Sequence, residues 1–433
     1  MAVISASVAV VPSVRQGGWR NLDWMMLAIV LCLSVWGCLT ISSASRPSQD
    51  IYAAYSPSPG AHAAPSDNAS SGASANALES AESGKSSTRT RGAKASNSVR
   101  GEATRQVISV VVGIVAIVLV IALDYQLLIY LQSWIYVFNL LFLGSLLVLP
   151  RSLAPVINGA KSWIHLGPLT LQPSEFCKVA VIITLAAFLC RRQERIGQGK
   201  TVLLSLLYLA PPLLLILKQP DLGTMLSVLL IWFGMLFFGG ARWQHLLAVT
   251  IVGLALFAAV WQFGGLKPYQ KERLSVFLQS DASARSNRGE GWQIKQSQIA
   301  IGGGGLNGQG FGQGIQSHSG YMPENTTDFV FTVVAEELGF IGGAALIILY
   351  LLLLLRSANL AMTTDNYFGV LIAGGFTALI AFHCVVNLGM TMRVMPITGV
   401  PLPFFSYGGS SLIAFSICVG LLQSIALRGR RNS

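Results

Sequence analysis

Long apolar runs recur along most of the chain and are separated by short polar connections. A helix needs about 20 mainly apolar residues to cross a bilayer, and ten stretches approach that requirement. They lie near residues 24–43, 107–123, 127–149, 174–190, 202–217, 222–240, 244–263, 328–355, 367–389 and 404–427. The pattern predicts an all-α, polytopic membrane protein with about ten transmembrane helices, forming a single membrane domain over residues 1–433.

Positive side chains in the connections predict the orientation of this bundle. An even number of spans places both termini on one side, and Lys and Arg favour cytoplasmic loops. The positive residues expected on that side are Arg15, Arg20, Arg191, Arg192, Arg195, Lys200, Arg242, Arg356, Arg428, Arg430 and Arg431. We therefore expect both termini to be cytoplasmic.

Three polar segments then face outward. Residues 44–106 are rich in Ser, Ala, Gly and Pro and contain almost no large apolar residues, so we expect a disordered loop. Residues 150–173 and 264–327 mix aromatic, Gly and charged residues, which is typical of loops that fold back on a membrane surface. We expect the large outer loop, 264–327, to bear part of the active site.

Composition supports a membrane protein and excludes other classes. Hydrophobic residues make up 53% of the chain and charged residues only 11%, and the mean hydropathy is +0.60. The net charge of +11 does not indicate a nucleic-acid partner, because the Lys and Arg form no basic groove with interleaved aromatics. The six cysteines lie in apolar stretches without CxxC spacing, so we interpret them as packing residues.

Ionisable residues at the mouth of a span are costly and are therefore candidates for function. Asp328 lies at the outer mouth of the eighth span, with Glu336 and Glu337 about two turns deeper. Asp328 and Glu336 would share one helix face and could form an acidic stripe into the bundle. The alternatives are a helix cap for Asp328 and buried ion pairing for the two glutamates, and the sequence leaves both open.

A second cluster begins the fourth span. Glu175 and Lys178 are three residues apart and fall on one helix face. They are either a local salt bridge after a helix start at Pro173, or a pair that orients a catalytic acid or binds an anionic head group. Asp221, in the turn before the sixth span, is either a helix cap or a ligand-binding residue.

The large outer loop combines positive charge with glycine. Its basic residues are Lys267, Lys271, Arg273, Arg285, Arg288 and Lys295, and glycines recur from Gly302 to Gly314. Basic side chains and exposed backbone amides suit an anionic pyrophosphate, although a flexible, solvated connection is the plainer interpretation. The glycines match no nucleotide-binding motif. The five histidines, His383 among them, have no metal-ligand spacing.

Several blocks in the same order resemble the SEDS family (shape, elongation, division and sporulation) of peptidoglycan polymerases, typified by RodA and FtsW. The matching blocks are 158–167, which includes Lys161; 172–178; 218–224; Gln296-Ser297 with the glycine run; 327–339; and 396–411, which includes Ser410. They cover nearly the whole chain apart from the first outer loop. The sequences of residues 266–270 and 398–403 are more similar to RodA than to FtsW.

The resemblance implies an enzyme that polymerises lipid II into glycan strands at the outer face of a bacterial cytoplasmic (inner) membrane, for cell elongation and rod shape. It makes Asp328 the best candidate for the catalytic residue. It also matches Glu175 and Lys178 to a family pair thought to influence the active arrangement. The full set of candidates for substrate binding or support is Glu175, Lys178, Lys161, Lys267, Arg273, Lys295, Gln296, Glu336, Glu337 and Ser410. The implied partners are lipid II, undecaprenyl-linked glycan, a class B penicillin-binding protein transpeptidase and other elongation-complex proteins.

Our hypothesis is that Asp328 is the general base that takes the proton from the acceptor sugar hydroxyl. Lys267, Arg273 and Lys295 would offset charge on the leaving pyrophosphate. A divalent cation, Mg²⁺ or Mn²⁺, is a further candidate for that task, although no ligand set is readable. The alternatives are a flippase for the lipid-linked precursor, an FtsW-like division polymerase, or a scaffold for other wall-synthesis proteins.

Two features depart from the family pattern. Residues 281–292 replace the family's usual Asp-Pro-x-Gly-x-Gly-Tyr run, so contacts made by that run do not transfer to this chain. The long Ser/Ala-rich insert in the first outer loop is atypical as well.

Overall fold

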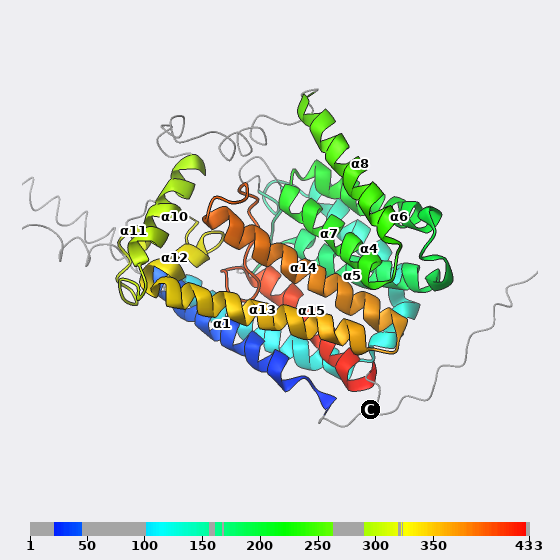
Figure 1. Cartoon of the computed structure of the whole chain (residues 1–433), viewed down its shortest axis with the longest axis horizontal. Helices are drawn as coiled ribbons and strands as arrows, with labels where there is room; N and C mark the ends of the chain where they lie inside the picture. The colour runs from blue at the N-terminus through cyan, green and yellow to red at the C-terminus, as the bar shows by residue number, and fades with distance from the viewer. Residues whose placement is uncertain are drawn as a thin grey trace, which may run out of the picture.

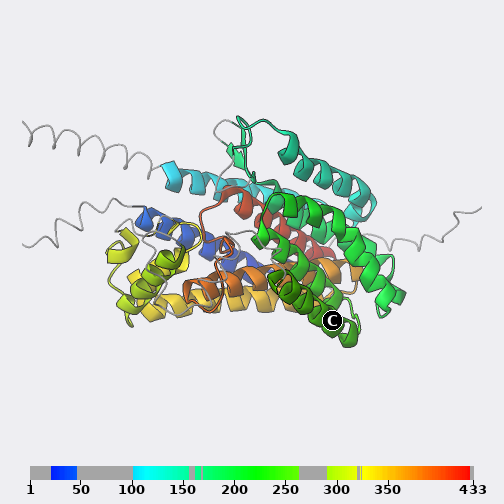
Figure 2. The same ribbon diagram turned by 90° about the horizontal axis from the view of Figure 1, so that it is seen from above.

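A computed structural model describes residues 21–45, 101–155, 161–166, 169–262, 290–318, 322 and 324–429. Its long helices run side by side along the longest axis of the molecule (Figures 1 and 2). The first half contains α1 (Trp24–Ala44), a helix over Gly101–Ala122, η2 (Tyr125–Leu127), α4 (Leu128–Val148), α5 (Pro173–Cys190), η3 (Gln193–Arg195), α6 (Gly199–Lys218), α7 (Leu222–Phe238) and α8 (Trp243–Gln262). The second half contains α10 (Glu290–Gly304), α11 (Ile315–His318), α12 (Val330–Glu337), α13 (Gly339–Thr363), α14 (Tyr367–Thr391) and α15 (Gly409–Gly429).

The predicted polytopic, all-α fold is confirmed. The described residues contain eight helices that are long and apolar enough to cross a membrane, and two shorter apolar helices, Leu222–Phe238 and Trp243–Ala259. Together they account for the ten predicted spans. Polar side chains define where several of them start: Asp221 accepts a hydrogen bond from Thr224 N at 2.9 Å and caps α7, and Asn366 caps α14 in the same way.

Two predicted spans differ from the structure in where their helices begin or break. The segment 328–355 is not one helix, because the chain breaks between α12 and α13 at Gly339, which has a φ of +66°. The last span begins at Gly409 and not at 404, since Phe404 has a φ of +64° and prolines precede it. The prolines at 401 and 403 are a local signal of the second break, whereas the first break, at Gly339, has no comparable signal.

The outer segments contain more regular structure than predicted. Residues 101–106, expected in the disordered loop, are the first turns of the second span. Part of the large outer loop forms α10 and α11, and an antiparallel hairpin pairs β1 (Ile164–Leu166) with β2 (Leu169–Leu171). Residues 46–100 and 263–289, which make up the rest of the first and third outer segments up to Glu290, lie outside the described residues.

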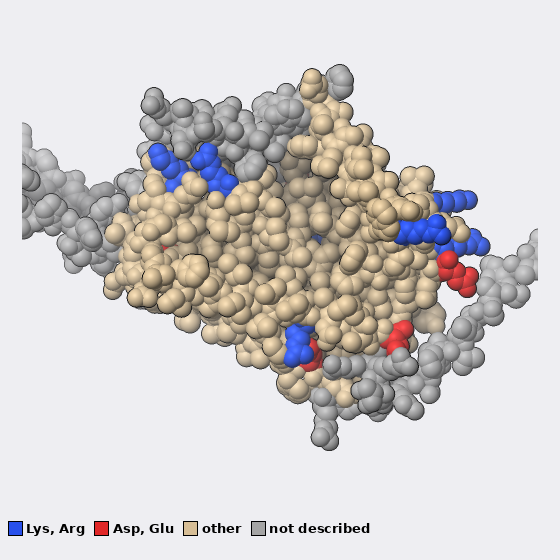
Figure 3. Space-filling view, viewed as in Figure 1, with Lys and Arg blue, Asp and Glu red and all other residues tan. Residues whose placement is uncertain are grey.

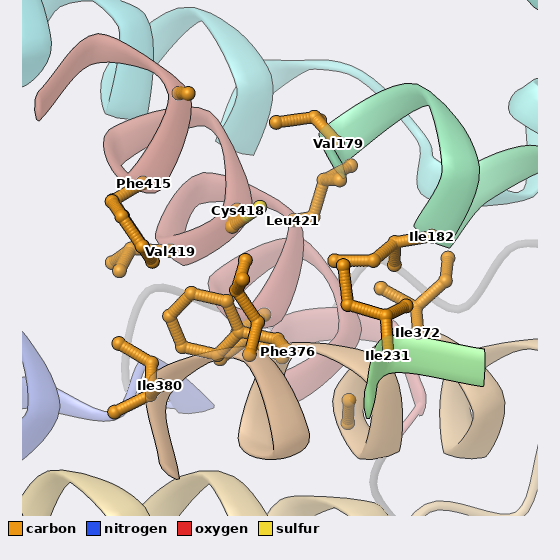
Figure 4. Close-up of a cluster of buried hydrophobic side chains, with 14 of the residues drawn as sticks. Val179, Ile182, Ile231, Ile372, Phe376, Ile380, Phe415, Cys418, Val419 and Leu421 are labelled. Atoms are coloured by element: carbon orange, nitrogen blue, oxygen red, sulfur yellow. The ribbon is translucent and has the colours of Figure 1, made fainter. Parts of the chain in front are cut away.

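Burial separates central helices from peripheral ones. In the most apolar window of α5 and of α15, 78% of residues are buried, against 17% for Gly101–Ala122. α14 packs against α5, α7, α13 and α15, and Figure 4 shows Val179, Ile231, Phe376 and Phe415 meeting in this core. Large apolar side chains such as Trp134 and Leu207 remain exposed on the periphery, as lipid-facing residues would be.

Figure 3 shows Lys and Arg at both ends of the bundle. One group lies near α10, and the other lies around the start of α6, at the end called the charged end below. At this charged end, Asp23 N donates to Gln423 Oε1 at 2.9 Å, and Arg428 Nη2 donates to Ile121 O at 3.1 Å. The first and last spans therefore meet at one end, as an even number of crossings requires. The opposite end, where α10 to α12 lie, is called the cleft end below.

Candidate active site

A cavity of about 700 Å³ opens between the first turns of α5 and α7, the turn before α12 and the segment that precedes α15. Its wall is rich in polar and charged side chains. We call it the cleft; its polar lining includes Ser162, Thr170, Gln172, Glu175, Lys178, Asp221, Thr224, Ser227, Gln293, Glu324, Thr327, Asp328, His383, Thr398, Tyr407 and Ser411. The cleft therefore joins segments that lie far apart in the sequence.

Asp328 lines this cleft from a turn and not from a helix. Residues 324–329 form turns in which Phe329 N donates to Glu324 O at 3.1 Å. Phe329 occupies the N-cap position of α12 without a side-chain cap, so the structure does not support the helix-cap alternative for Asp328. Asn387 Nδ2 donates to the Asp328 carbonyl at 3.0 Å and fixes its backbone to α14.

The segment 397–401 passes next to the Asp328 carboxylate. Gly399 has a φ of +70°, and a Cβ added there would lie 3.5 Å from Asp328 Oδ2. On the other side of the segment, a Cβ added to Gly223 would lie only 2.8 Å from Thr398 O. Gly223 thus allows α7 to approach this backbone closely, and Gly399 supplies the left-handed conformation of the segment beside Asp328.

Glu175 and Lys178 form a buried ion pair in the same wall. Lys178 Nζ lies 2.8 Å from Glu175 Oε1, and the side chains are only 2% and 4% exposed. Glu175 Oε2 has no hydrogen-bond partner although it is buried, so this carboxylate retains accepting capacity beside the cleft. Pro173 occupies the first turn of α5 and sets the start of the helix that presents the pair.

Glu336 and Glu337 do not line the cleft, and they form no acidic stripe with Asp328. Glu336 accepts hydrogen bonds from Gln316 N at 2.7 Å, from Ser317 N at 2.9 Å and from the Ser317 hydroxyl. Glu337 accepts from Ser43 Oγ at 2.6 Å. These carboxylates fasten α11 and the end of α1 to α12, which is a structural arrangement closer to the buried-pairing alternative.

The glycine run packs against α12 and does not present free amides to the cleft. A Cβ on Gly304 would lie 2.0 Å from Ala335 O, and one on Gly308 would lie 2.1 Å from Glu337 O. Gln309 N and Gly310 N donate to the carbonyls of Glu336 and Glu337 at 2.9 and 3.0 Å. Close packing therefore explains these glycines, and the expected pyrophosphate cradle is not formed by these two amides.

The remaining predicted residues occupy different surroundings. Ser410 accepts from Gln172 N and donates to Thr170 O, both at 3.1 Å, so it joins the hairpin to α15. Lys161 Nζ donates to Leu149 O at 3.3 Å. Gln296 is buried and Lys295 is exposed on α10, and neither lines the cleft. Lys267 and Arg273 lie outside the described residues.

Sequence reasoning did not single out several cleft residues. Trp163 and Tyr407 contribute aromatic surface, and Gln293 and Glu324 contribute polar groups. Trp163 and Tyr407 stand inside the blocks that carried the family resemblance, which was the available signal. The sequence indicated only that His383 has no metal-ligand spacing, and the structure places it in the cleft lining beside Lys178.

Among the residues that the structure describes, no three His, Cys, Asp or Glu side chains are grouped so that they could hold a metal ion. The described cleft residues therefore provide no three-ligand metal site of their own, and a divalent cation that also binds the substrate pyrophosphate stays a prediction.

An apolar bundle of long helices with a polar, carboxylate-bearing cleft at one end defines a polytopic membrane protein with a polar site at the end of its helices. The profile of the FtsW/RodA/SpoVE family, described as "Cell cycle protein", matches residues 85–431, and the chain belongs to this family. The family prediction is confirmed.

Named relatives agree with this assignment. The chain is 35% identical over 332 residues to stage V sporulation protein E of Bacillus subtilis, covering 76% of this chain and 87% of the relative. It is 38% identical over 280 residues to peptidoglycan glycosyltransferase MrdB of Escherichia coli, covering 65% of this chain and 74% of the relative. The predicted enzyme class, peptidoglycan glycosyltransferase, is therefore the class that this relative's name gives.

Solved structures agree as well. A chain of a peptidoglycan synthase complex, described as coordinating polymerization and crosslinking, matches with a TM-score of 0.68 and 30% identity, covering 94% of this chain and 98% of that one. The rod shape determining protein RodA of Thermus thermophilus matches with a TM-score of 0.60 and 28% identity, covering 96% and 99%.

Proposed function

We propose that this membrane-embedded peptidoglycan glycosyltransferase polymerises lipid II into glycan strands at the outer face of a bacterial cytoplasmic membrane, and that it serves cell elongation. The observation that supports this most directly is the cleft, which brings Asp328 and the Glu175–Lys178 pair together at one end of an apolar bundle. A lipid-linked sugar needs a polar site of this kind, open at the level of the head groups.

In the proposed reaction, Asp328 accepts the proton of the acceptor sugar hydroxyl. The hydroxyl oxygen forms a bond to the anomeric carbon of the donor sugar as the bond from that carbon to the lipid pyrophosphate breaks. The undecaprenyl pyrophosphate leaves with the bonding electron pair. Glu175 Oε2, buried and without a hydrogen-bond partner, is the proposed acceptor for a donor group of the bound sugar.

Topology supports an outer location for this chemistry. Arg191, Arg192, Arg195 and Lys200 lie between the end of α5 and the start of α6, at the end opposite the cleft, and positive residues in short loops favour the cytoplasmic side. We therefore place the cleft at the outer leaflet, where a polymerase would add to the growing wall.

The proposed partner is a transpeptidase of the class B penicillin-binding proteins, together with other elongation-complex proteins. It rests on the likeness to a chain from a peptidoglycan synthase complex. The assignment to elongation rests on the RodA-like sequence of residues 398–403. A division polymerase is the second candidate, because other relatives are named FtsW.

A flippase for the same precursor is the alternative from another class. Alternating access favours ionisable residues at the midplane of the bilayer. Among the described residues, the acidic side chains instead lie near helix ends, with Glu175, Asp221 and Asp328 at the cleft end and Asp124 and Asp365 at the charged end. This distribution favours a reaction at the membrane surface over transport through the bilayer.

The test is lipid II polymerisation by purified protein carrying Asp328→Asn, with and without a chelator and the transpeptidase. Asn preserves the size of the side chain but cannot accept a proton. We expect turnover to fall by about 10²- to 10⁴-fold with an unchanged unfolding midpoint. Asp365→Asn is the matched control, since it makes the same change at an exposed position of the opposite end.

Near-wild-type turnover of a folded Asp328→Asn protein would refute the role of Asp328. A wild-type protein that neither polymerises nor transfers the precursor would favour a scaffold. Precursor transfer into sealed vesicles without polymerisation by the wild-type protein would favour the flippase. Activity that disappears with the chelator would show that a divalent cation takes part.

A further inference from the structure

His383 is a buried residue of the cleft wall. It has no role in the proposed reaction. It lies on α14 and its side chain is fully buried. Nε2 lies 3.3 Å from Lys178 Nζ, and Nδ1 lies 2.8 Å from the Pro401 carbonyl oxygen. The ring thus stands between the Glu175–Lys178 pair and the segment 397–401.

The neighbours of the ring require one protonation state. Lys178 Nζ lies 2.8 Å from a carboxylate oxygen of Glu175, so it is an ammonium group that only donates. His383 Nε2 must then be the unprotonated nitrogen that accepts from Lys178. The Pro401 carbonyl only accepts, so Nδ1 must carry the proton. His383 is therefore a neutral imidazole in its Nδ1–H tautomer.

The Pro401 carbonyl belongs to the backbone beside Asp328. One turn further along α14, Asn387 Nδ2 donates to the carbonyls of both Asp328 and Val400, at 3.0 and 2.8 Å. His383 and Asn387 are four residues apart and share a helix face. Together they hold the carbonyls of Val400 and Pro401, while Gly399 lies against the Asp328 carboxylate.

We propose that His383 is a positioning residue: through its Nδ1–H bond to Pro401 and its Nε2 contact with Lys178, it couples the buried ion pair to the segment that flanks Asp328. It touches no reacting atom in this account. The proposal rests on the proposed function, because it concerns the geometry of the same site.

The first experiment measures kcat and KM for lipid II polymerisation by three variants. His383→Phe removes both polar contacts, and we expect kcat to fall by about tenfold to a hundredfold with KM changed by less than about twofold. His383→Asn can keep a donor near the position of Nδ1, and should recover most of kcat. His383→Gln can contact Lys178 but does not place a donor at the Pro401 carbonyl, so it should recover less of kcat than His383→Asn.

Cys384→Ala is the matched control, since Cys384 is buried on the same helix but does not line the cleft. It should lower stability without lowering kcat per folded enzyme. If His383→Phe keeps kcat within about twofold of wild type, or loses only the folded fraction as the control does, the proposal is overturned.

A double-mutant cycle tests the link to the ion pair. If Lys178 and His383 act through one connection, Lys178→Met combined with His383→Phe should reduce kcat no further than Lys178→Met alone. Multiplied losses would contradict the coupling.

The tautomer gives a readout that does not depend on activity. In protein with ¹⁵N-labelled histidine, NMR should show one residue with a protonated Nδ1 and a bare Nε2, and this signal should be absent from His383→Asn. An imidazolium or an Nε2–H tautomer at His383 would overturn the proposal. Inactive wild-type protein, or active Asp328→Asn, would instead show that the proposed function itself fails.

Discussion

The cleft and the Glu336–Glu337 cluster both bury acidic side chains at the same end of the bundle, but they treat them differently. Both oxygens of Glu336 accept hydrogen bonds from the backbone and hydroxyl of the 316–317 segment. In the cleft, Glu175 Oε2 is buried beside the cavity without a hydrogen-bond partner. A carboxylate whose lone pairs are occupied by its own protein holds structure, whereas one with spare capacity beside a cavity can act on a ligand.

The strongest test of this contrast is the ion pair of the cleft. Glu175→Gln or Lys178→Met alone leaves a buried charge without its partner, which should cost about 3–5 kcal/mol of stability. Both should also reduce polymerisation strongly. The midpoint of thermal unfolding and the rate of polymerisation measure the two effects.

The combined variant Glu175→Gln/Lys178→Met sharpens the test. Replacing both charges removes the desolvation problem, so stability should return towards that of the wild type. Polymerisation should stay low, because the Glu175 oxygen and the Lys178 contact with His383 are both lost. Recovery of both properties would mean that the pair has only a structural role.

At Glu336 we expect a smaller effect, which lowers stability and leaves turnover nearly unchanged. Glu336→Gln places an amide NH₂ among groups that donate, and should lower stability by about 2 kcal/mol. The turnover of the folded fraction should stay within about threefold of wild type. A large loss of turnover with unchanged stability would contradict the distinction between the two regions.

The smallest effect is expected at Ser410, which joins the hairpin to α15. Ser410→Ala removes the partners of Gln172 N and Thr170 O and should cost about 1 kcal/mol. Ser145→Ala is the control, because Ser145 Oγ bonds only within its own helix, to Phe142 O. Equal unfolding midpoints for the two variants would show that the junction contributes nothing of its own.

The fold was largely predictable because a span leaves a simple signature of about 20 apolar residues. The break at Gly339 was not, because a single glycine within a long span does not by itself interrupt a helix, and only its φ of +66° reveals the interruption. The prolines and glycines of residues 396–411 did indicate a broken helix before the last span. The β1–β2 hairpin had a local signal in the apolar ends of Ile164–Leu166 and Leu169–Leu171, each flanking a polar residue. That signal is weak in segments of three residues.

The site was predictable only in part for a different reason. Local spacing paired Glu175 with Lys178, and the family resemblance singled out Asp328. Neither places both groups in one cleft, because that depends on the packing of α5 and α14 against the turn before α12. Assuming a helix from residue 328 also led to an acidic stripe that does not form, since α12 begins at Val330.

The contact between Asp23 and Gln423 has a consequence for protein engineering. Because the first and last spans meet there, a circular permutant could link the start of α1 to the end of α15 over a short distance, with its new ends at Ser45 and Gly101. These two residues lie at the cleft end, where Gln106 contacts Ser406 and Gly408, so that a fused tag would be presented beside the cleft.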